Sequence, residues 1–132
     1  MLKLIYGPKG SGKTKQIIDQ ANSVVDKAKG NVLFVTKSKT YSVNINFAVK
    51  CVYTDDYGID SADSLRGFIN GLAAANYDTE YVFIDGIARI TKTDLVDLES
   101  VFESAARLTD ITFVFTVSST EAELPEFLKK FI

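Results

Sequence analysis

Residues 7–14 read Gly-Pro-Lys-Gly-Ser-Gly-Lys-Thr, which matches the pattern G-x-x-x-x-G-K-[ST] at every fixed position. A short apolar run of strand character, residues 2–6, comes directly before this stretch. Apolar residues recur at helical spacing after it; they are Ile17, Ile18, Ala21, Val24, Val25 and Ala28. Strand, Gly-rich turn and helix form the context in which this pattern binds phosphate groups. The stretch therefore predicts both the start of a sheet and the loop that carries the site.

All eight residues of the loop are expected to contribute to phosphate binding. They are Gly7, Pro8, Lys9, Gly10, Ser11, Gly12, Lys13 and Thr14. Gly7 and Gly12 are expected to adopt backbone angles that residues with a Cβ avoid, and Pro8 has no N–H to donate. The amides of residues 9–14 then converge on an anion at the positive end of the following helix. Lys13 is expected to bridge the β- and γ-phosphates of a nucleotide, and Thr14 to offer its hydroxyl to Mg²⁺.

The bulk composition is that of an ordinary globular protein. The chain has 132 residues, of which 46% are hydrophobic and 24% charged, and its length suits one domain, residues 1–132. The formal net charge of −2 gives no general electrostatic reason to expect nucleic acid as a partner. Histidine is absent and Cys51 is the one cysteine, which excludes histidine catalysis, a disulfide within the chain and a cysteine metal cluster.

The sequence also predicts no association with a membrane. Its longest apolar runs are far too short to span a bilayer. The N-terminus enters a predicted strand at once, without the pattern of a signal peptide. We therefore expect the protein in the cytoplasm.

Further along the chain, predicted strands alternate with predicted helices. The strands are expected at 31–36, 47–54, 81–85 and 111–117; the helices at 13–29 with Gly30 as stop, from Ser61, from about Thr93 and near the C-terminus. This alternation predicts a three-layer α/β/α sandwich with a mostly parallel sheet. In the helix from Ser61, Gly67, Gly71 and Ala75 fall four apart, which favours close packing against the sheet, with a protein contact as the alternative.

Polar residues stand at several predicted strand ends, where ligands lie in parallel sheets. They are Asp55, Asp56, Asp85 and Ser118. Asp85 ends a buried strand and is expected to hold Mg²⁺ through water, beside Thr14. A carboxylate that only closes the strand is the plainer alternative for Asp85.

The stretch 82–90, Val-Phe-Ile-Asp-Gly-Ile-Ala-Arg-Ile, is similar to the Walker B segment of RecA-type ATPases. Together with the element order, it makes the chain resemble a P-loop NTPase with a RecA-like core, and also small uncharacterised bacterial ATP-binding proteins. The resemblance implies the P-loop NTPase fold, with ATP or ADP and Mg²⁺ as ligands. The sequence departs from it in one respect. Many such ATPases place a glutamate directly after the aspartate, whereas this chain has Gly86, and the neighbouring strand ends in Thr-Lys-Ser at 36–38.

Without that glutamate, other residues are candidates for catalysis beside Lys13 and Asp85. Asp55 or Asp56 is a candidate base, with a plain turn as the alternative reading. Ser118 or Ser119 is a candidate sensor of the γ-phosphate. Arg89, the nearest of the three arginines, is a candidate for stabilising transferred charge, with a surface ion pair as its alternative role.

The stretch Thr91-Lys92-Thr93-Asp94 matches a variant of the guanine-reading motif of GTPases. It begins only six residues after Asp85, whereas that motif normally follows a later strand. Thr91 or Thr93 as a helix N-cap, with Asp94 in the first turn, explains the stretch better. The choice between adenine and guanine stays open.

The sequence leaves three functions to compare. The first is an ATP- and Mg²⁺-binding protein that is a weak or partner-activated ATPase. The second is a non-catalytic, nucleotide-dependent switch or assembly module, acting on an unknown protein partner or by self-association. The third, weaker, is a small-molecule kinase in which the loop 37–46 holds the acceptor.

Overall fold

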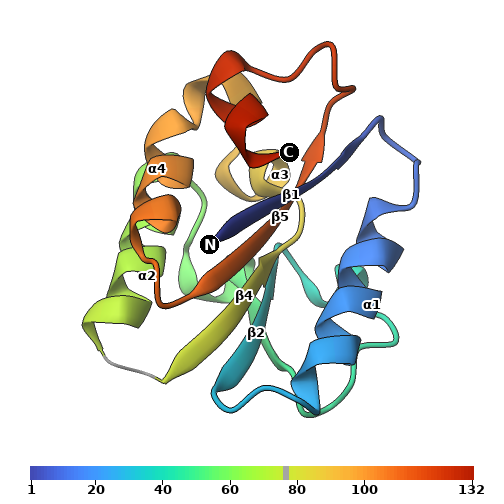
Figure 1. Ribbon diagram of the computed structural model, residues 1–132, viewed down its shortest axis with the longest axis vertical. Helices are drawn as coiled ribbons and strands as arrows, with labels where there is room; N and C mark the ends of the chain where they lie inside the picture. The colour runs from blue at the N-terminus through green and yellow to red at the C-terminus, as the bar shows by residue number, and fades with distance from the viewer. Residues whose placement is uncertain (76–77) are drawn as a thin grey trace.

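The computed structural model describes residues 1–75 and 78–132, which form a five-stranded sheet with helices on both faces (Figure 1). The strands are β1 (Leu2–Gly7), β2 (Asn31–Thr36), β3 (Lys50–Tyr53), β4 (Thr79–Ile84) and β5 (Thr112–Ser118). Their order is β1-β5-β4-β2-β3, and every neighbouring pair is parallel. The mostly parallel sheet of the sequence prediction is confirmed. β5 lies between β4, the strand before it in the chain, and β1, the first strand of the chain.

The helices are α1 (Lys13–Val25), α2 (Ala62–Ala74), α3 (Ile87–Thr91) and α4 (Glu99–Arg107). Short 3-10 turns cover Lys39–Tyr41, Thr54–Tyr57, Leu95–Asp97 and Glu126–Phe131. α1 packs on one face of the sheet, whereas α2, α3 and α4 share a core with its other face. In residues 1–75 and 78–132, no helix combines the length and the apolar character needed to cross a membrane.

Both faces of the sheet are buried, which explains why the strands are nearly continuously apolar. In β2, Phe34 faces α1, and its neighbours Leu33 and Val35 face the opposite layer. β5 alternates in the same way, with Val114 toward α1 and Phe115 toward α4. The period-two alternation of a strand therefore gives each layer its own apolar cluster.

The first helix is shorter than predicted. α1 ends at Val25, and the amides of Lys27 and Ala28 both donate to the carbonyl of Val24. Gly30 is therefore not the stop of the helix. A Cβ on Gly30 would lie 2.5 Å from the carbonyl oxygen of Asp78, so the glycine allows the chain to pass close to the start of β4.

The strand predicted at 47–54 is also too long at its start. β3 begins at Lys50, whereas 47–49 form a turn in which Phe47 is 99% exposed. Asn46 fixes this turn, because its side chain accepts from the amide of Ala48 and its amide donates to Asn22. These asparagine hydrogen bonds compete with the pairing of a strand.

The segment after β4 holds an additional helix. The sequence predicts one helix from about Thr93, but α3 ends at Thr91 and α4 begins only at Glu99. Neither Thr91 nor Thr93 is an N-cap: Thr91 donates to the carbonyl of Ile87 within α3, and Thr93 donates to the carbonyl of Thr91. The predicted apolar stripe is nevertheless correct in α4, where Val101 is buried in the core.

The small residues of α2 do not pack closely against the sheet, contrary to the prediction. A Cβ added at Gly67 or Gly71 would meet nothing within 4 Å. The start of α2 agrees with the prediction, because Ser61 is its N-cap and forms a capping box with Ser64. The buried side of α2 is instead made by Leu65 and Ile69.

Candidate functional site

The Gly-rich loop joins the end of β1 to the start of α1 at the carboxyl edge of the sheet (Figure 1). Gly10 and Gly12 have φ values of +79° and +86°, which are strained for any residue with a Cβ. Gly7 is not among the residues with positive φ, so its predicted role was wrong and Gly10 takes its place. A Cβ on Gly7 would lie 2.7 Å from the Oγ of Ser11, so Gly7 gives room to the loop itself.

The loop leaves open space at Gly10 and Gly12, which is called the cradle below. A Cβ at Gly10 or Gly12 would meet nothing within 4 Å. Gly12 is the N-cap of α1 and offers no side chain to the first amides of the helix, which have no acceptor inside the helix. A helix start of this kind attracts anions through its amides and its dipole.

Lys13 folds back over the loop. Its Nζ donates to the carbonyl of Pro8 at 2.9 Å, and the same carbonyl accepts from the amide of Ser11 at 3.2 Å. Burial lowers the pKa of the Lys13 ammonium from its ordinary value; Asp85 opposes this shift and the charge of Arg89 adds to it. The ammonium therefore lies in the field of both groups, next to the cradle.

The structure brings Asp85 against Thr14, although 71 positions separate them. The Thr14 Oγ1 donates to the two Asp85 carboxylate oxygens at 3.1 and 3.3 Å. Asp85 follows directly after β4 and is only 2% exposed. A carboxylate buried to this extent needs partners that offset its lost hydration. Thr14 is one of these partners. Because Thr14 is the last residue of the loop pattern, its hydrogen bond connects the loop to Asp85.

Thr116 is a second partner of Asp85, and the sequence analysis missed it. Its Oγ1 donates to Asp85 Oδ1 at 2.8 Å and accepts from the amide of Gly86 at 2.8 Å. It lies in β5, the strand between β1 and β4. A threonine inside an apolar strand is normally present for its β-branched shape, so only its place two residues before Ser118 hinted at a polar role.

Arg89 is the third partner of Asp85. Its Nη2 lies 3.5 Å from Asp85 Oδ2, and its Cζ lies 3.8 Å from the centre of the Tyr41 ring. Gly86 makes this position accessible, because a Cβ there would lie 2.7 Å from the Arg89 Cζ. The guanidinium thus fills the space that a side chain at position 86 would need.

Buried polar atoms without a hydrogen-bond partner in the described part of the chain are found near Asp85. They include Thr36 Oγ1 and Arg89 Nε. Thr36 ends β2, the neighbour of β4, and it is fully buried. Unpaired polar atoms are costly when buried, and at such positions a bound polar group or water supplies the missing partner.

The structure does not bring Asp55 and Asp56 against Asp85. Both lie in the 3-10 turn after β3, at the edge of the sheet, with β2 between that strand and β4. Asp55 is paired with Lys37, at 2.9 Å. Ser118 lies in register with Gly7 in the pairing of β1 with β5, so it does stand at the start of the loop.

Gly86→Ala is expected to destabilise the protein. Its φ is +79°, and the new methyl group would collide with the Arg89 guanidinium. We expect a loss of about 1–3 kcal/mol in the free energy of unfolding, measured by urea denaturation. Gly67→Ala is the matched control: it adds a methyl group in open space on a helix, and it is expected to stabilise by up to about 1 kcal/mol. Equal effects of the two substitutions would contradict this account of Gly86.

The residues at this edge of the sheet fit a magnesium nucleotide. The cradle at Gly10 and Gly12 is open, and Thr14 and Asp85 together offer one hydroxyl and one carboxylate. Mg²⁺ in nucleotide sites is commonly held by one or two carboxylates, with phosphates and waters as the other ligands. Nowhere in residues 1–75 and 78–132 do three or more Asp, Glu, His or Cys gather as a metal cluster. An Mg²⁺ ion at this edge of the sheet would be held by the Thr14 hydroxyl and the Asp85 carboxylate.

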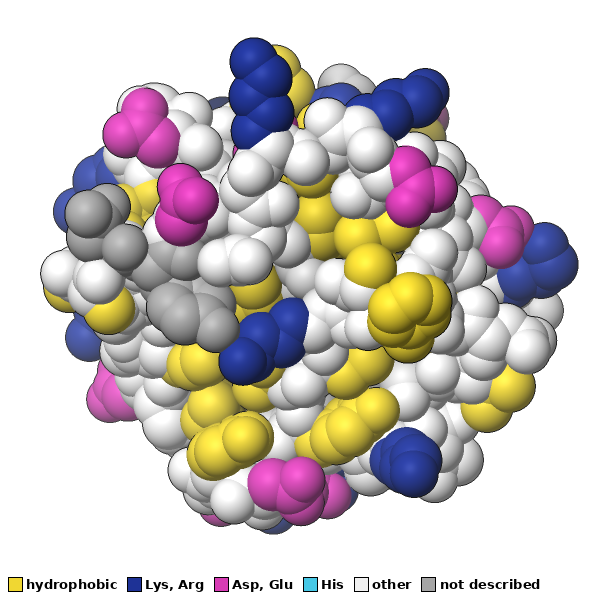
Figure 2. Space-filling view, turned by 90° about the horizontal axis from the view of Figure 1, so that it is seen from below, with side chains coloured by type: hydrophobic (Ala, Val, Ile, Leu, Met, Phe, Trp, Pro, Cys, Tyr) yellow, Lys and Arg dark blue, Asp and Glu magenta, His cyan; other side chains and the backbone are white. Residues whose placement is uncertain are grey.

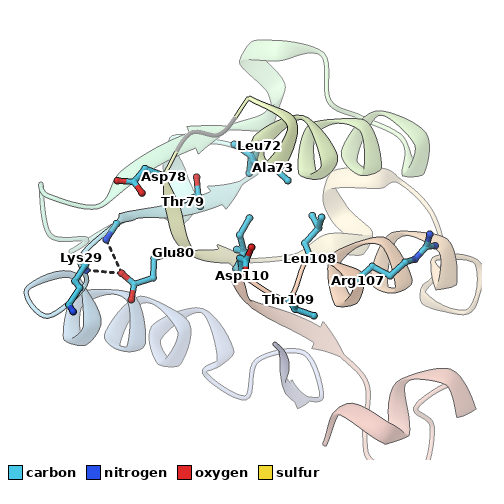
Figure 3. A pocket seen from close by; sticks show the side chains of 12 residues that line it. Lys29, Leu72, Ala73, Asp78, Thr79, Glu80, Arg107, Leu108, Thr109 and Asp110 are labelled. Carbon is cyan, nitrogen blue, oxygen red and sulfur yellow. Dashed lines mark hydrogen bonds between the residues drawn. The ribbon is translucent and has the colours of Figure 1, made fainter.

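A cavity of about 680 Å³ lies at the opposite end of the sheet, where the strands begin (Figure 3). Glu80 at its rim accepts hydrogen bonds from the amides of Lys29 and Gly30, so its carboxylate already has partners. Figure 3 shows the Arg107 side chain directed away from Glu80 and Asp78. Acidic and basic side chains are interspersed on the face shown in Figure 2. The charged residues that line this cavity are likewise of both signs: Lys29, Asp78, Glu80, Arg107 and Asp110.

Comparison of the sequence with protein-family models finds no match, and comparison with curated proteins finds none either.

Proposed function

We propose that this chain is a P-loop protein that binds ATP together with Mg²⁺ and is a weak or partner-activated ATPase. The observation that carries the proposal is the contact between the Thr14 hydroxyl and the buried Asp85 carboxylate. A loop with the phosphate-binding pattern and a carboxylate from a distant strand are the two parts that such a site requires. Their direct contact supports a function that neither part would support alone.

Each residue has a specific role in the proposal. The amides of residues 9–14, apart from that of Ser11, which donates to the Pro8 carbonyl, would face the phosphates, and Lys13 would turn from the same carbonyl to bridge the β- and γ-phosphates. Thr14 and Asp85 hold Mg²⁺, directly or through water. Thr116 orients Asp85 by donating to its Oδ1. When bound, the ion neutralises charge on the β- and γ-phosphate oxygens.

Slow hydrolysis follows from the surroundings of Gly86. In the ATPases that the chain resembles, a glutamate at this position prepares the attacking water, whereas here the Arg89 guanidinium fills the space. A cation cannot accept the proton of water. We therefore expect turnover to be slow, or to need a group from a partner or a second copy of the chain.

A nucleotide-dependent switch is the second candidate. The observation that favours it is the stacking of Arg89 on Tyr41, which connects the surroundings of Asp85 to the segment between β2 and β3. Multiple-turnover release of phosphate from ATP separates the two candidates. A rate that rises with protein concentration supports an ATPase activated by self-association, and binding without any turnover supports the switch.

Thr14→Val is expected to weaken the effect of Mg²⁺ on nucleotide binding. The substitution keeps the shape of the side chain and removes the hydroxyl that contacts Asp85. In calorimetric titrations with ATP and with GTP, we expect wild-type affinity to rise when Mg²⁺ is added. The gain should fall at least about ten-fold in Thr14→Val.

Thr93→Val is the matched control for this experiment, because the Thr93 hydroxyl donates only to the carbonyl of Thr91 among the contacts described. It should bind like the wild type. If the wild-type protein binds neither ATP nor GTP in the presence of Mg²⁺, the proposed function is wrong.

A further inference from the structure

Arg89 is held loosely beside Asp85. Its one ion pair there is long, at 3.5 Å, and its other described contact is the stacking on Tyr41. Its Nε is buried and donates to no described residue. A guanidinium has five N–H donors, and it binds carboxylates or phosphates best through two parallel hydrogen bonds. The described residues therefore use only part of the hydrogen-bonding capacity of Arg89.

The charges around Asp85 favour an incoming anion. Lys13 and Arg89 are two cations beside one buried carboxylate, which leaves the immediate site with an excess of positive charge. A nucleoside triphosphate carries more negative charge than a diphosphate, and the additional charge is on its terminal phosphate. A planar guanidinium matches a phosphate better than it matches a carboxylate held at 3.5 Å by a single nitrogen.

We infer that Arg89 distinguishes a nucleoside triphosphate from a diphosphate by leaving Asp85 for the terminal phosphate. The inference depends on the proposed function, because it needs a nucleotide in the cradle of the loop. With a diphosphate bound, Arg89 stays between Asp85 and Tyr41. With a triphosphate bound, Asp85 is released from its cation and the Tyr41 ring loses its stacking partner.

Tyr41 carries this change away from the site. It is the last residue of the 3-10 turn Lys39–Tyr41, in the segment that joins β2 to β3. Tyr41 also lines a cavity of about 440 Å³, together with Thr14 and Ile18 of α1. This cavity gives the ring and its segment room to move when Arg89 leaves. The terminal phosphate thereby controls the surroundings of a surface segment.

The first test compares the affinities of ADP and of a non-hydrolysable ATP analogue, both with Mg²⁺, by calorimetry. We expect the wild type to prefer the analogue, and Arg89→Gln to reduce that preference roughly ten- to hundred-fold with ADP binding retained. Arg89→Lys, which keeps the charge, should restore part of the preference. Arg107→Gln, at an exposed arginine at the other end of the molecule, should leave it unchanged.

The second test places a fluorescent reporter at position 41. The chain contains no tryptophan, so Tyr41→Trp introduces a single indole that also stacks well on a guanidinium. We expect the ATP analogue to change its emission and ADP to leave the emission nearly unchanged. The difference should vanish when Arg89→Gln is added to Tyr41→Trp.

The outcomes separate the two proposals. If the wild type and Arg89→Gln show the same preference between the two nucleotides, the role of Arg89 is wrong and the proposed function stands. Equal emission changes with ADP and the analogue would overturn the coupling to Tyr41. If the wild type binds neither nucleotide, the proposed function fails, and the role of Arg89 fails with it.

Discussion

Lys13→Ala is expected to lower the affinity for magnesium nucleotide by about a hundred-fold or more while the fold stays intact. The Lys13 ammonium lies over the loop, where its Nζ reaches the Pro8 carbonyl at 2.9 Å. Bridging two phosphates would replace this one hydrogen bond by two charge-assisted ones. Each such bond contributes roughly 1.5–3 kcal/mol, and two of them amount to about two powers of ten or more in affinity.

Lys15→Ala is the control for charge alone. Lys15 is exposed on the same turn of α1 and pairs with Asp19 at 2.7 Å, a surface ion pair of small energetic value. Calorimetric titration should show binding by Lys15→Ala and almost none by Lys13→Ala, with equal urea midpoints. Nucleotide binding by Lys13→Ala at wild-type affinity would show that the loop does not hold the phosphates.

Phe102→Ala is expected to cost about 3–5 kcal/mol of stability, which is a large part of the total for a protein of this size. Phe102 in α4 is fully buried, with its ring centre 4.8 Å from that of Phe115 and 6.2 Å from that of Phe127. It therefore joins α4 to β5 and to the C-terminal 3-10 turn. Truncation removes transfer free energy and leaves a cavity among large rings that collapse poorly.

Phe47→Ala is the matched control for this loss, because Phe47 is 99% exposed. It should change the free energy of unfolding by less than about 0.5 kcal/mol in urea denaturation. Only the folded protein brings Thr116 of β5 against Asp85. Phe102→Ala should therefore weaken nucleotide binding in proportion to the unfolded fraction. Similar unfolding curves for the two alanine variants would contradict the central place of Phe102 in the core.

The sequence predicted the sheet well because its strands are buried on both faces. Runs such as 31–36 and 111–117 are mostly apolar, and they match β2 and nearly match β5. Boundaries were predicted less well where side chains near the ends of elements bond to the backbone. Asn46 is the clearest example: its side chain accepts from the amide of Ala48, and its own amide donates to the side chain of Asn22, where the pattern indicated a strand.

The candidate site was predicted in outline. The loop pattern and the position of Asp85 at a strand end led to two residues that the structure places in contact. Thr116 was missed, because nothing in a single strand reveals which neighbouring strand lies beside it. The position of Arg89 against Gly86 was not predictable either, since the pattern gave one helix from about 93 and did not include α3. The site residues that the prediction missed or misplaced are those whose contacts depend on tertiary neighbours, which local propensity does not reveal.

The place of β5 between β1 and β4 also sets the order in which the molecule can be assembled. β1 precedes the other four strands in the chain, yet within the described residues it pairs in the sheet with β5 alone. The amine of Met1 also donates to the carbonyl of Ile111, 110 positions later. Contacts at this sequence separation close late, because the chain entropy of a long loop must be overcome first. β1, which leads into the phosphate loop, therefore pairs with β5 only after residues 112–118 have left the ribosome. Nascent chains shorter than this should not retain nucleotide, although they already contain the complete loop.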